Sequence, residues 1–179
     1  NDYDQNSNLE IQRIGGFKVF RKFRKAYMVN EYLKTNTAKA IFFDHWKSLE
    51  YIKTDYLNKS SNFCLIHSKE INHPIGSSLN TRMNKAFKKA EFIIANSKYT
   101  KELGVNVGLE EKKIHIIHPG TNYPAKIHDK DKSEAKDIFG STFPKIITIA
   151  RLDKRKSHQN ILMTIKNLVP TYPNIKYVC

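Results

Sequence analysis

Four basic side chains lie close together in the last third of the chain. They follow Ile146–Ile149, an apolar, β-branched run that predicts a buried strand, and they precede a helix for which Ser157 is the predicted cap. Open α/β sheets bind anionic ligands on loops of this kind, and Arg and Lys together suit a diphosphate. A solvated basic turn explains the same pattern equally well from charge alone. The four residues are Arg151, Lys154, Arg155 and Lys156.

A second candidate is His67, which follows the predicted strand Phe63–Ile66 and precedes Glu70 by three residues. A histidine at the carboxyl end of a strand can hydrogen bond a substrate hydroxyl or act as an acid or base near neutral pH. A partly buried histidine bonded to the backbone is the alternative. Asp44 and Ser97 follow two other predicted strands, and we expect both to cap helices.

The composition restricts the classes of function. The chain has 179 residues, with 31 basic and 17 acidic side chains and a net charge of +14, which favours anionic partners such as nucleic acid, nucleotide phosphates or an acidic membrane face. Its lysines are spread along the chain, which is weaker evidence for nucleic acid than a compact arginine patch. No apolar run approaches the ~20 residues of a membrane span. No zinc spacing, Walker loop or Gly-x-Gly-x-x-Gly motif is present. Cys64 and Cys179 lie in predicted strands, so we expect buried, reduced thiols in a cytosolic protein.

The periodicity predicts alternating strands and helices, and therefore a parallel sheet covered on both faces. One expected helix, 17–34, places Phe20, Phe23 and Tyr27 near one face and basic residues around the rest. We interpret it as packed on the core with a solvated basic face; contact with an anionic membrane is the alternative. The expected strands are 40–43, 63–66, 92–95, 114–117, 146–149 and 175–179. The other expected helices carry Trp46 to Ile52, Leu79 to Ala90 and Tyr99 to Leu103, or span 133–139 and 158–168.

Three segments recur in the order and spacing of one enzyme family. They are Phe92–Leu103 (FIIANSKYTKEL), Ile114–Thr121 (IHIIHPGT) and Ile149–His158 (IARLDKRKSH). Together they resemble family 4 (group 1) retaining glycosyltransferases of the GT-B fold, and the resemblance covers about residues 40–179. It implies an α/β, GT-B-like fold: part of an N-terminal Rossmann-like parallel-sheet domain, followed by the first βαβ unit of a C-terminal Rossmann-like domain. The implied limits are 1–124 for the acceptor-side domain, 125–143 for a linker and 144–179 for the start of the donor-binding domain.

The resemblance also implies roles for three residues. Arg151 and Lys156 match the pair that grips the donor diphosphate, where their charge stabilises the leaving group without a metal ion or other cofactor. His67 lies in His-Ser-Lys-Glu, similar to the family's His-Gly-x-Glu, and matches a catalytic-site residue that faces the transferred sugar. Ala150 and Ser157 stand where the family usually has glycine. The family's glycine-rich loop and glutamate motif are absent from the chain, so we expect an interior fragment that is inactive alone.

The function implied is transfer of a sugar from a nucleotide-diphosphate sugar to a hydroxyl acceptor with retention of configuration, in glycan or glycolipid synthesis. The expected partners are a nucleotide-sugar donor and a hydroxyl acceptor, lipid-linked in one version of the hypothesis. The expected location is the cytoplasm, with peripheral contact at the inner face of the membrane as an extension. A basic, non-enzymatic module that binds nucleic acid is the alternative function.

Overall fold

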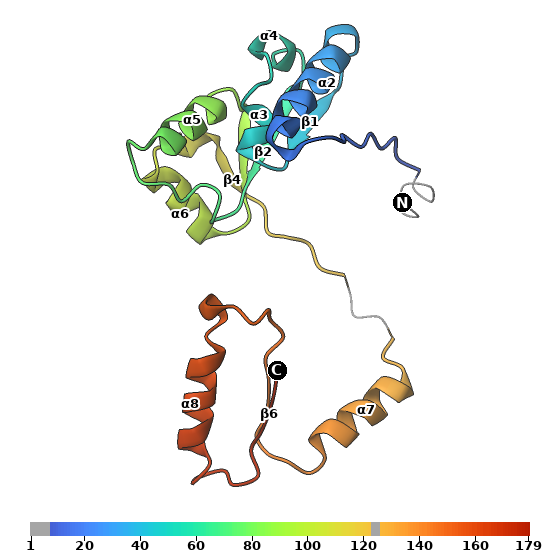
Figure 1. The fold of residues 1–179 in the computed structure, drawn as a ribbon, viewed down its shortest axis with the longest axis vertical. Coiled ribbons are helices and arrows are strands. Elements are labelled where there is room, and N and C mark those ends of the chain that lie inside the picture. The colour runs from blue at the N-terminus through green and yellow to red at the C-terminus, as the bar shows by residue number, and fades with distance from the viewer. Residues whose placement is uncertain (1–7, 123–125) are drawn as a thin grey trace. The chain divides into compact units, whose positions relative to one another are not determined.

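The computed structural model describes residues 8–122 and 126–179, which belong to two compact units, Asn1–Gly120 and Thr121–Cys179 (Figure 1). The predicted boundary between residues 124 and 125 lies outside the described residues. Each unit contains its own parallel sheet, four-stranded in the first and two-stranded in the second. The predicted α/β class with a parallel sheet is therefore confirmed.

The sheet of the first unit has its strands in sequence order, each pairing in parallel with the next. Every crossover therefore moves in the same direction. Because such crossovers are almost always right-handed, they place all the connecting helices on one face. The strands are β1 (Ala40–Phe43), β2 (Ser61–Ile66), β3 (Phe92–Ala95) and β4 (Ile114–Ile116), and the helices and 3₁₀ turns are η1 (Lys18–Phe20), α2 (Arg21–Thr35), α3 (Trp46–Leu49), α4 (Thr54–Leu57), α5 (Ser78–Phe87), α6 (Lys98–Asn106) and η2 (Glu111–Lys113).

The prediction that this sheet is covered on both faces is wrong. Along β2 burial alternates: Cys64 and Ile66 are buried under the helices, whereas Phe63 is only partly covered. On the less covered face a row of rings crosses the strands, Phe42 stacking on Phe63 at 4.7 Å and Phe63 on Phe92 at 5.0 Å between ring centroids. The sequential strand order explains the difference, since it places the described helices that connect these strands on the other face.

The core of the first unit lies between the sheet and its helices. Trp46 and Leu49 of α3 are fully buried there, and so are Ile66 of β2 and Met83 of α5. Gly104 of α6 lies so close to β4 that a Cβ would come within 3.2 Å of the Ile114 side chain. These contacts hold the helices against the strands and fix the edge where the strands end.

Helix α2 buries a different face from the one predicted. Ala26 and Leu33 are its buried residues and Val29 packs beside them, whereas Phe20 and Tyr27 are exposed. Phe23 is 46% exposed and lies against Tyr51. The small and aliphatic residues thus face the core and the aromatic residues face solvent.

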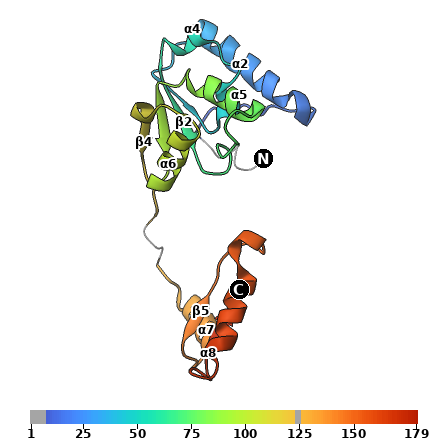
Figure 2. The same cartoon turned by 90° about the vertical axis from the view of Figure 1, so that its left-hand side faces the viewer.

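The second unit is a βαβ unit, as predicted, with α8 running alongside its two strands (Figures 1 and 2). Its described residues include no buried side chain. Helix α7 begins four residues before the predicted start, because Asp129 and Asp131 supply the negative charge that favours a helix start. Cys179 follows the last paired residue and is exposed, so its predicted burial is wrong, whereas Cys64 is buried as expected. The elements are α7 (Asp129–Phe139), β5 (Lys145–Ile147), η3 (Lys154–Lys156), α8 (His158–Leu168) and β6 (Lys176–Val178).

Candidate functional site

The carboxyl ends of the four parallel strands bring several polar residues to one edge of the first unit. Asp44, His67 and Asn96 each come directly after the last residue of a strand. Strands β1, β2 and β3 are neighbours, so these three positions lie along the same edge. This is the edge at which open α/β sheets bind ligands.

His67 is exposed at this edge, and the residues after it hold its backbone. Its N–H donates a hydrogen bond to a carboxylate oxygen of Glu70, so Glu70 caps the end of β2. The indole N–H of buried Trp46 donates to the backbone oxygen of Glu70 at 2.9 Å. The loop is thereby tied to the core, and the His67 side chain is presented to solvent from a supported backbone.

The N-terminus of α3 is capped by His45 and not, as predicted, by Asp44. His45 Nδ1 accepts a hydrogen bond from the backbone N–H of Lys47 at 3.0 Å, while Asp44 accepts one from the Ser48 hydroxyl. Partial burial, with a smaller contribution from Lys47, lowers the pKa of His45 from its usual value. At neutral pH the ring is therefore uncharged and able to accept this bond.

The predicted cap at Ser97 is confirmed. Its hydroxyl accepts a hydrogen bond from the backbone N–H of Thr100 at 3.2 Å, and it also contacts the Thr100 hydroxyl. Asn96 accepts a further hydrogen bond from that hydroxyl at 2.7 Å. Both side chains are engaged in starting α6, which leaves Ser97 a structural residue.

In the second unit, the basic loop after β5 contains one cationic side chain that is paired with a carboxylate and others that are not. Asp153 accepts hydrogen bonds from the Arg155 backbone N–H at 3.0 Å and from its guanidinium at 3.2 Å. These bonds lower the pKa of Asp153 and raise that of Arg155. Arg151 and Lys156 are exposed, and neither side chain hydrogen bonds or forms an ion pair with a described residue. Arg151 and Lys156 are thus the loop's accessible cations, together with Lys154.

Ser157 adopts a left-handed backbone, with φ of 55° and ψ of 31°. Its side chain makes no capping hydrogen bond to α8, so the prediction that it caps this helix is wrong. Glycine adopts a left-handed backbone with the least strain, whereas a serine there is strained by its Cβ.

His158 connects the basic loop to the strand behind it. Its Nε2 lies 3.1 Å from the backbone oxygen of Arg151, and its Nδ1 lies 3.5 Å from the hydroxyl of Tyr177 on β6. Because a carbonyl only accepts, Nε2 carries the proton in this arrangement. His158 therefore restrains the backbone at Arg151, a role that the sequence did not reveal.

A hollow of about 420 Å³ opens beside this loop. It is lined by Leu152, Asp153, Lys154, Ser157, His158, Gln159 and Asn160. Its volume lies within the usual range for small-molecule sites, about 300–1,000 Å³. Arg151 and Lys156 belong to the same loop without being among the lining residues.

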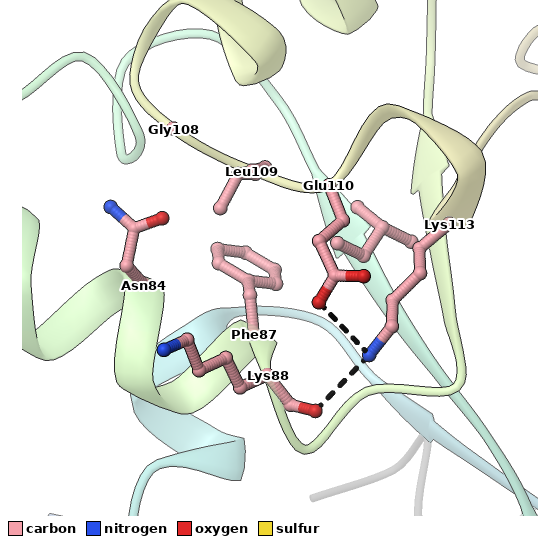
Figure 3. Close-up of a pocket in the computed structure, with 8 residues that line it drawn as sticks. Asn84, Phe87, Lys88, Gly108, Leu109, Glu110 and Lys113 are labelled. Atoms are coloured by element: carbon pink, nitrogen blue, oxygen red, sulfur yellow. Dashed lines mark hydrogen bonds and ion pairs between the residues drawn. The ribbon is translucent and has the colours of Figure 1, made fainter.

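A smaller cavity in the first unit is excluded as a ligand site. It lies between the end of α5 and the segment before β4, and its volume is about 30 Å³, room for little more than a water molecule (Figure 3). Beside it, the Lys113 ammonium donates to the Lys88 backbone oxygen at 3.1 Å and lies 3.7 Å from a carboxylate oxygen of Glu110. These contacts close the segment onto α5 and are structural.

Neither unit offers a metal centre within residues 8–122 and 126–179: no group of three or more His, Cys, Asp or Glu side chains there is arranged to hold an ion. No helix in the same described ranges is long and apolar enough to cross a membrane.

The fold is similar to solved structures of Anabaena Alr3699/HepE. The chain resembles Anabaena Alr3699/HepE in complex with UDP, with a TM-score of 0.57 and 15% identity over 86% of this chain and 50% of that one. It also resembles HepE in complex with UDP and glucose, with a TM-score of 0.59 and 17% identity over 93% of this chain and 45% of that one. No protein-family model matches the sequence, and no curated protein matches it.

The chain thus spans about half the length of the HepE structures it matches. At this identity the likeness shows the fold, and it confirms the predicted GT-B-like architecture. Two supporting residues, His45 in the first unit and His158 in the second, had no predicted role. The available signal was their position at a helix start that follows a strand, since His45 is the residue before α3 and His158 is the first residue of α8.

Proposed function

We propose that this chain is part of a glycosyltransferase that moves a sugar from a nucleoside-diphosphate sugar to a hydroxyl acceptor. The observation that carries the proposal is the basic loop after β5, where Arg151 and Lys156 are unpaired and their chain neighbours Leu152 and Ser157 line a hollow of about 420 Å³. The likeness to a fold solved with UDP and UDP-glucose supports a nucleotide sugar as donor. The proposal extends to transfer in glycan or glycolipid synthesis.

In the proposed reaction the bond between the anomeric carbon and the diphosphate oxygen breaks, and the acceptor oxygen forms the new bond on the same face of the sugar. The acceptor hydroxyl gives its proton to the departing diphosphate oxygen, which leaves from the same face. Negative charge grows on the departing diphosphate, where Arg151 and Lys156 stabilise it electrostatically and make a metal ion unnecessary. His67 hydrogen bonds a hydroxyl of the reacting sugar from the supported end of β2.

Calorimetric titration of the natural full-length protein with UDP, GDP and ADP tests the donor site. We expect micromolar binding of one nucleotide, lost in Arg151→Ala and in Lys156→Ala because each removes an unpaired cation. Arg155→Ala is the matched control: it removes a neighbouring cation that is already paired with Asp153, and we expect binding within a few-fold of the original.

Two results would overturn the proposal. One is equal loss in all three variants, which indicates only a general effect of charge. The other is no binding of any nucleotide, with salt-sensitive binding of nucleic acid instead, the behaviour of the alternative function. Loss of sugar transfer in His67→Ala with unchanged nucleotide binding would support the role of His67 separately.

A further inference from the structure

The start of α2 and the turn before it form an exposed surface that combines aromatic and basic side chains. Phe17 is 83% exposed, Phe20 59% and Tyr27 67%. Large apolar side chains gathered in one place on a surface mark a site of interaction with a protein or a membrane. We call this the aromatic–basic surface; it consists of Phe17, Val19, Phe20, Phe23 and Tyr27 with Lys18, Arg21 and Arg24.

The packing of α2 fixes which face points outward. Ala26 and Leu33 are buried against the first unit, so the opposite side of the helix, with Phe20 and Tyr27, cannot also reach that core. The aromatic side chains are therefore held in solvent by the contacts that bury the other face of the helix.

The turn that carries Phe17 is also held in place. The Arg24 guanidinium donates to the backbone oxygen of Phe17 at 3.1 Å. Gly16 lies beneath that guanidinium with φ of 82°, and a Cβ there would lie 2.6 Å from Arg24 Nη1. These contacts hold the Phe17 backbone beside the start of α2, where its oxygen also accepts a hydrogen bond from the Phe20 N–H at 3.2 Å.

The charge of this surface has one sign. Residues 17–30 include five basic side chains and no acidic one. Two of the five contact the first unit: Lys22 lies 3.5 Å from the Tyr51 hydroxyl and Lys25 lies 3.8 Å from Asp44. Lys18 and Arg21 have no hydrogen-bond or ion-pair partner among the residues described. The partner that complements the surface therefore carries negative charge next to an environment that accepts aromatic rings.

We propose that the aromatic–basic surface docks on the face of a lipid bilayer that contains anionic lipids. Phe and Tyr side chains lie well at the level of the headgroups, and Lys and Arg are attracted to anionic lipid phosphates. The helix lies in the plane of the interface and does not cross the bilayer. This proposal is independent of nucleotide binding.

Sedimentation with vesicles tests the proposal on the full chain. We expect binding to phosphatidylcholine vesicles that contain phosphatidylglycerol, little binding to phosphatidylcholine alone, and weaker binding at high salt. Lys18→Gln with Arg21→Gln weakens binding about thirtyfold, because each basic residue near an anionic surface contributes about fivefold. Phe17→Ser with Phe20→Ser abolishes it at low and high salt alike.

Matched controls exist in the same unit. Tyr99 of α6 is 65% exposed, a fraction similar to the 67% of Tyr27. Tyr99→Ser should therefore leave binding unchanged, whereas Tyr27→Ser should weaken it. Lys85→Gln with Lys88→Gln removes the same charge from α5 and should change binding less than twofold. Circular dichroism of each variant checks that the fold is kept, as expected for exposed side chains.

Three results would overturn the proposal. The first is equal binding to both kinds of vesicle, or to neither. The second is equal weakening by the α2 variants and by their controls, which indicates attraction by net charge alone. The third is loss of vesicle binding in Phe42→Ser while the Phe17→Ser, Phe20→Ser variant binds as the original does. That result would assign the contact to the less covered face of the sheet.

Discussion

The two units repeat the same strand–helix–strand pattern, yet among the described residues the buried side chains all lie in the first. Leu49 of α3 is fully buried, whereas Leu162 of α8 is 54% exposed. Four strands and the helices on one face enclose apolar side chains between two layers; two strands give α8 too little surface to do so. The difference teaches that the apolar stripe of a helix is buried only where neighbouring strands and helices cover it.

The largest expected contrast between the units is in cysteine reactivity. Burial raises the pKa of the Cys64 thiol, which is therefore protonated at neutral pH as well as inaccessible. With a disulfide reagent, exposed Cys179 should react at least about a thousandfold faster than Cys64, since Cys64 is reached only when a unit with a stability of about 5 kcal/mol or more opens. Mass spectrometry of timed samples measures both sites. Similar rates would show that β2 opens by itself.

Matched leucine substitutions should differ next most. Leu49→Ala leaves a cavity in the core and costs about 3 kcal/mol of unfolding free energy, whereas Leu162→Ala removes a half-exposed side chain and costs under about 1 kcal/mol. Urea unfolding followed by the fluorescence of Trp46, the only tryptophan, reports the first unit. If Leu162→Ala also moves this transition, the two units unfold together and the comparison fails.

Acid should weaken the first unit through His45. Its pKa is lowered from 6.5, so the folded unit binds this proton less readily than the unfolded chain. The stability that the neutral ring contributes is complete above about pH 6.5 and is lost as the pH falls through the lowered pKa, about 1 kcal/mol if the cap breaks. Unfolding free energies measured on both sides of this range check it. His45→Asn keeps a capping oxygen that does not titrate, and an unchanged pH dependence in that variant would contradict the assignment.

The smallest expected effects compare two helix starts, one in each unit. Ser157→Gly relieves a left-handed serine and should stabilise the second unit by up to about 1 kcal/mol, partly offset by the greater freedom of glycine in the unfolded chain. Ser97→Gly removes a working cap from extended backbone and should destabilise the first unit by a few tenths of a kcal/mol. Thermal unfolding by circular dichroism measures both signs. The same sign at both positions would refute the distinction.

Local pattern was sufficient for most of the elements. Strands β1 and β3 and helix α8 have the predicted bounds, because each is a short apolar run or an apolar stripe between clear stop signals. The Ser97 cap was predictable for the same reason, since a cap depends on the next three residues. Helix α4 was not predicted, because a single turn has too few residues to show a period.

In the candidate site, too, some features could be predicted from the local sequence and others could not. The positions of His67, Arg151 and Lys156 after strands could be read from the sequence, but not that Asp153 pairs with Arg155 or that His158 contacts the Arg151 backbone. The Arg155 and His158 side chains are long enough to reach several neighbouring groups. Which one it bonds depends on the turn geometry, and here that includes the left-handed Ser157.

The sequence by itself determined the alternation of strands and helices and the ends at which polar residues gather, because both depend on neighbours within a few positions. Only the tertiary structure decided that α2 turns its aromatic residues outward and that the sheet has helices on one face. Periodicity shows that a helix has an apolar stripe; strand order and the packing of distant elements select the face that is buried.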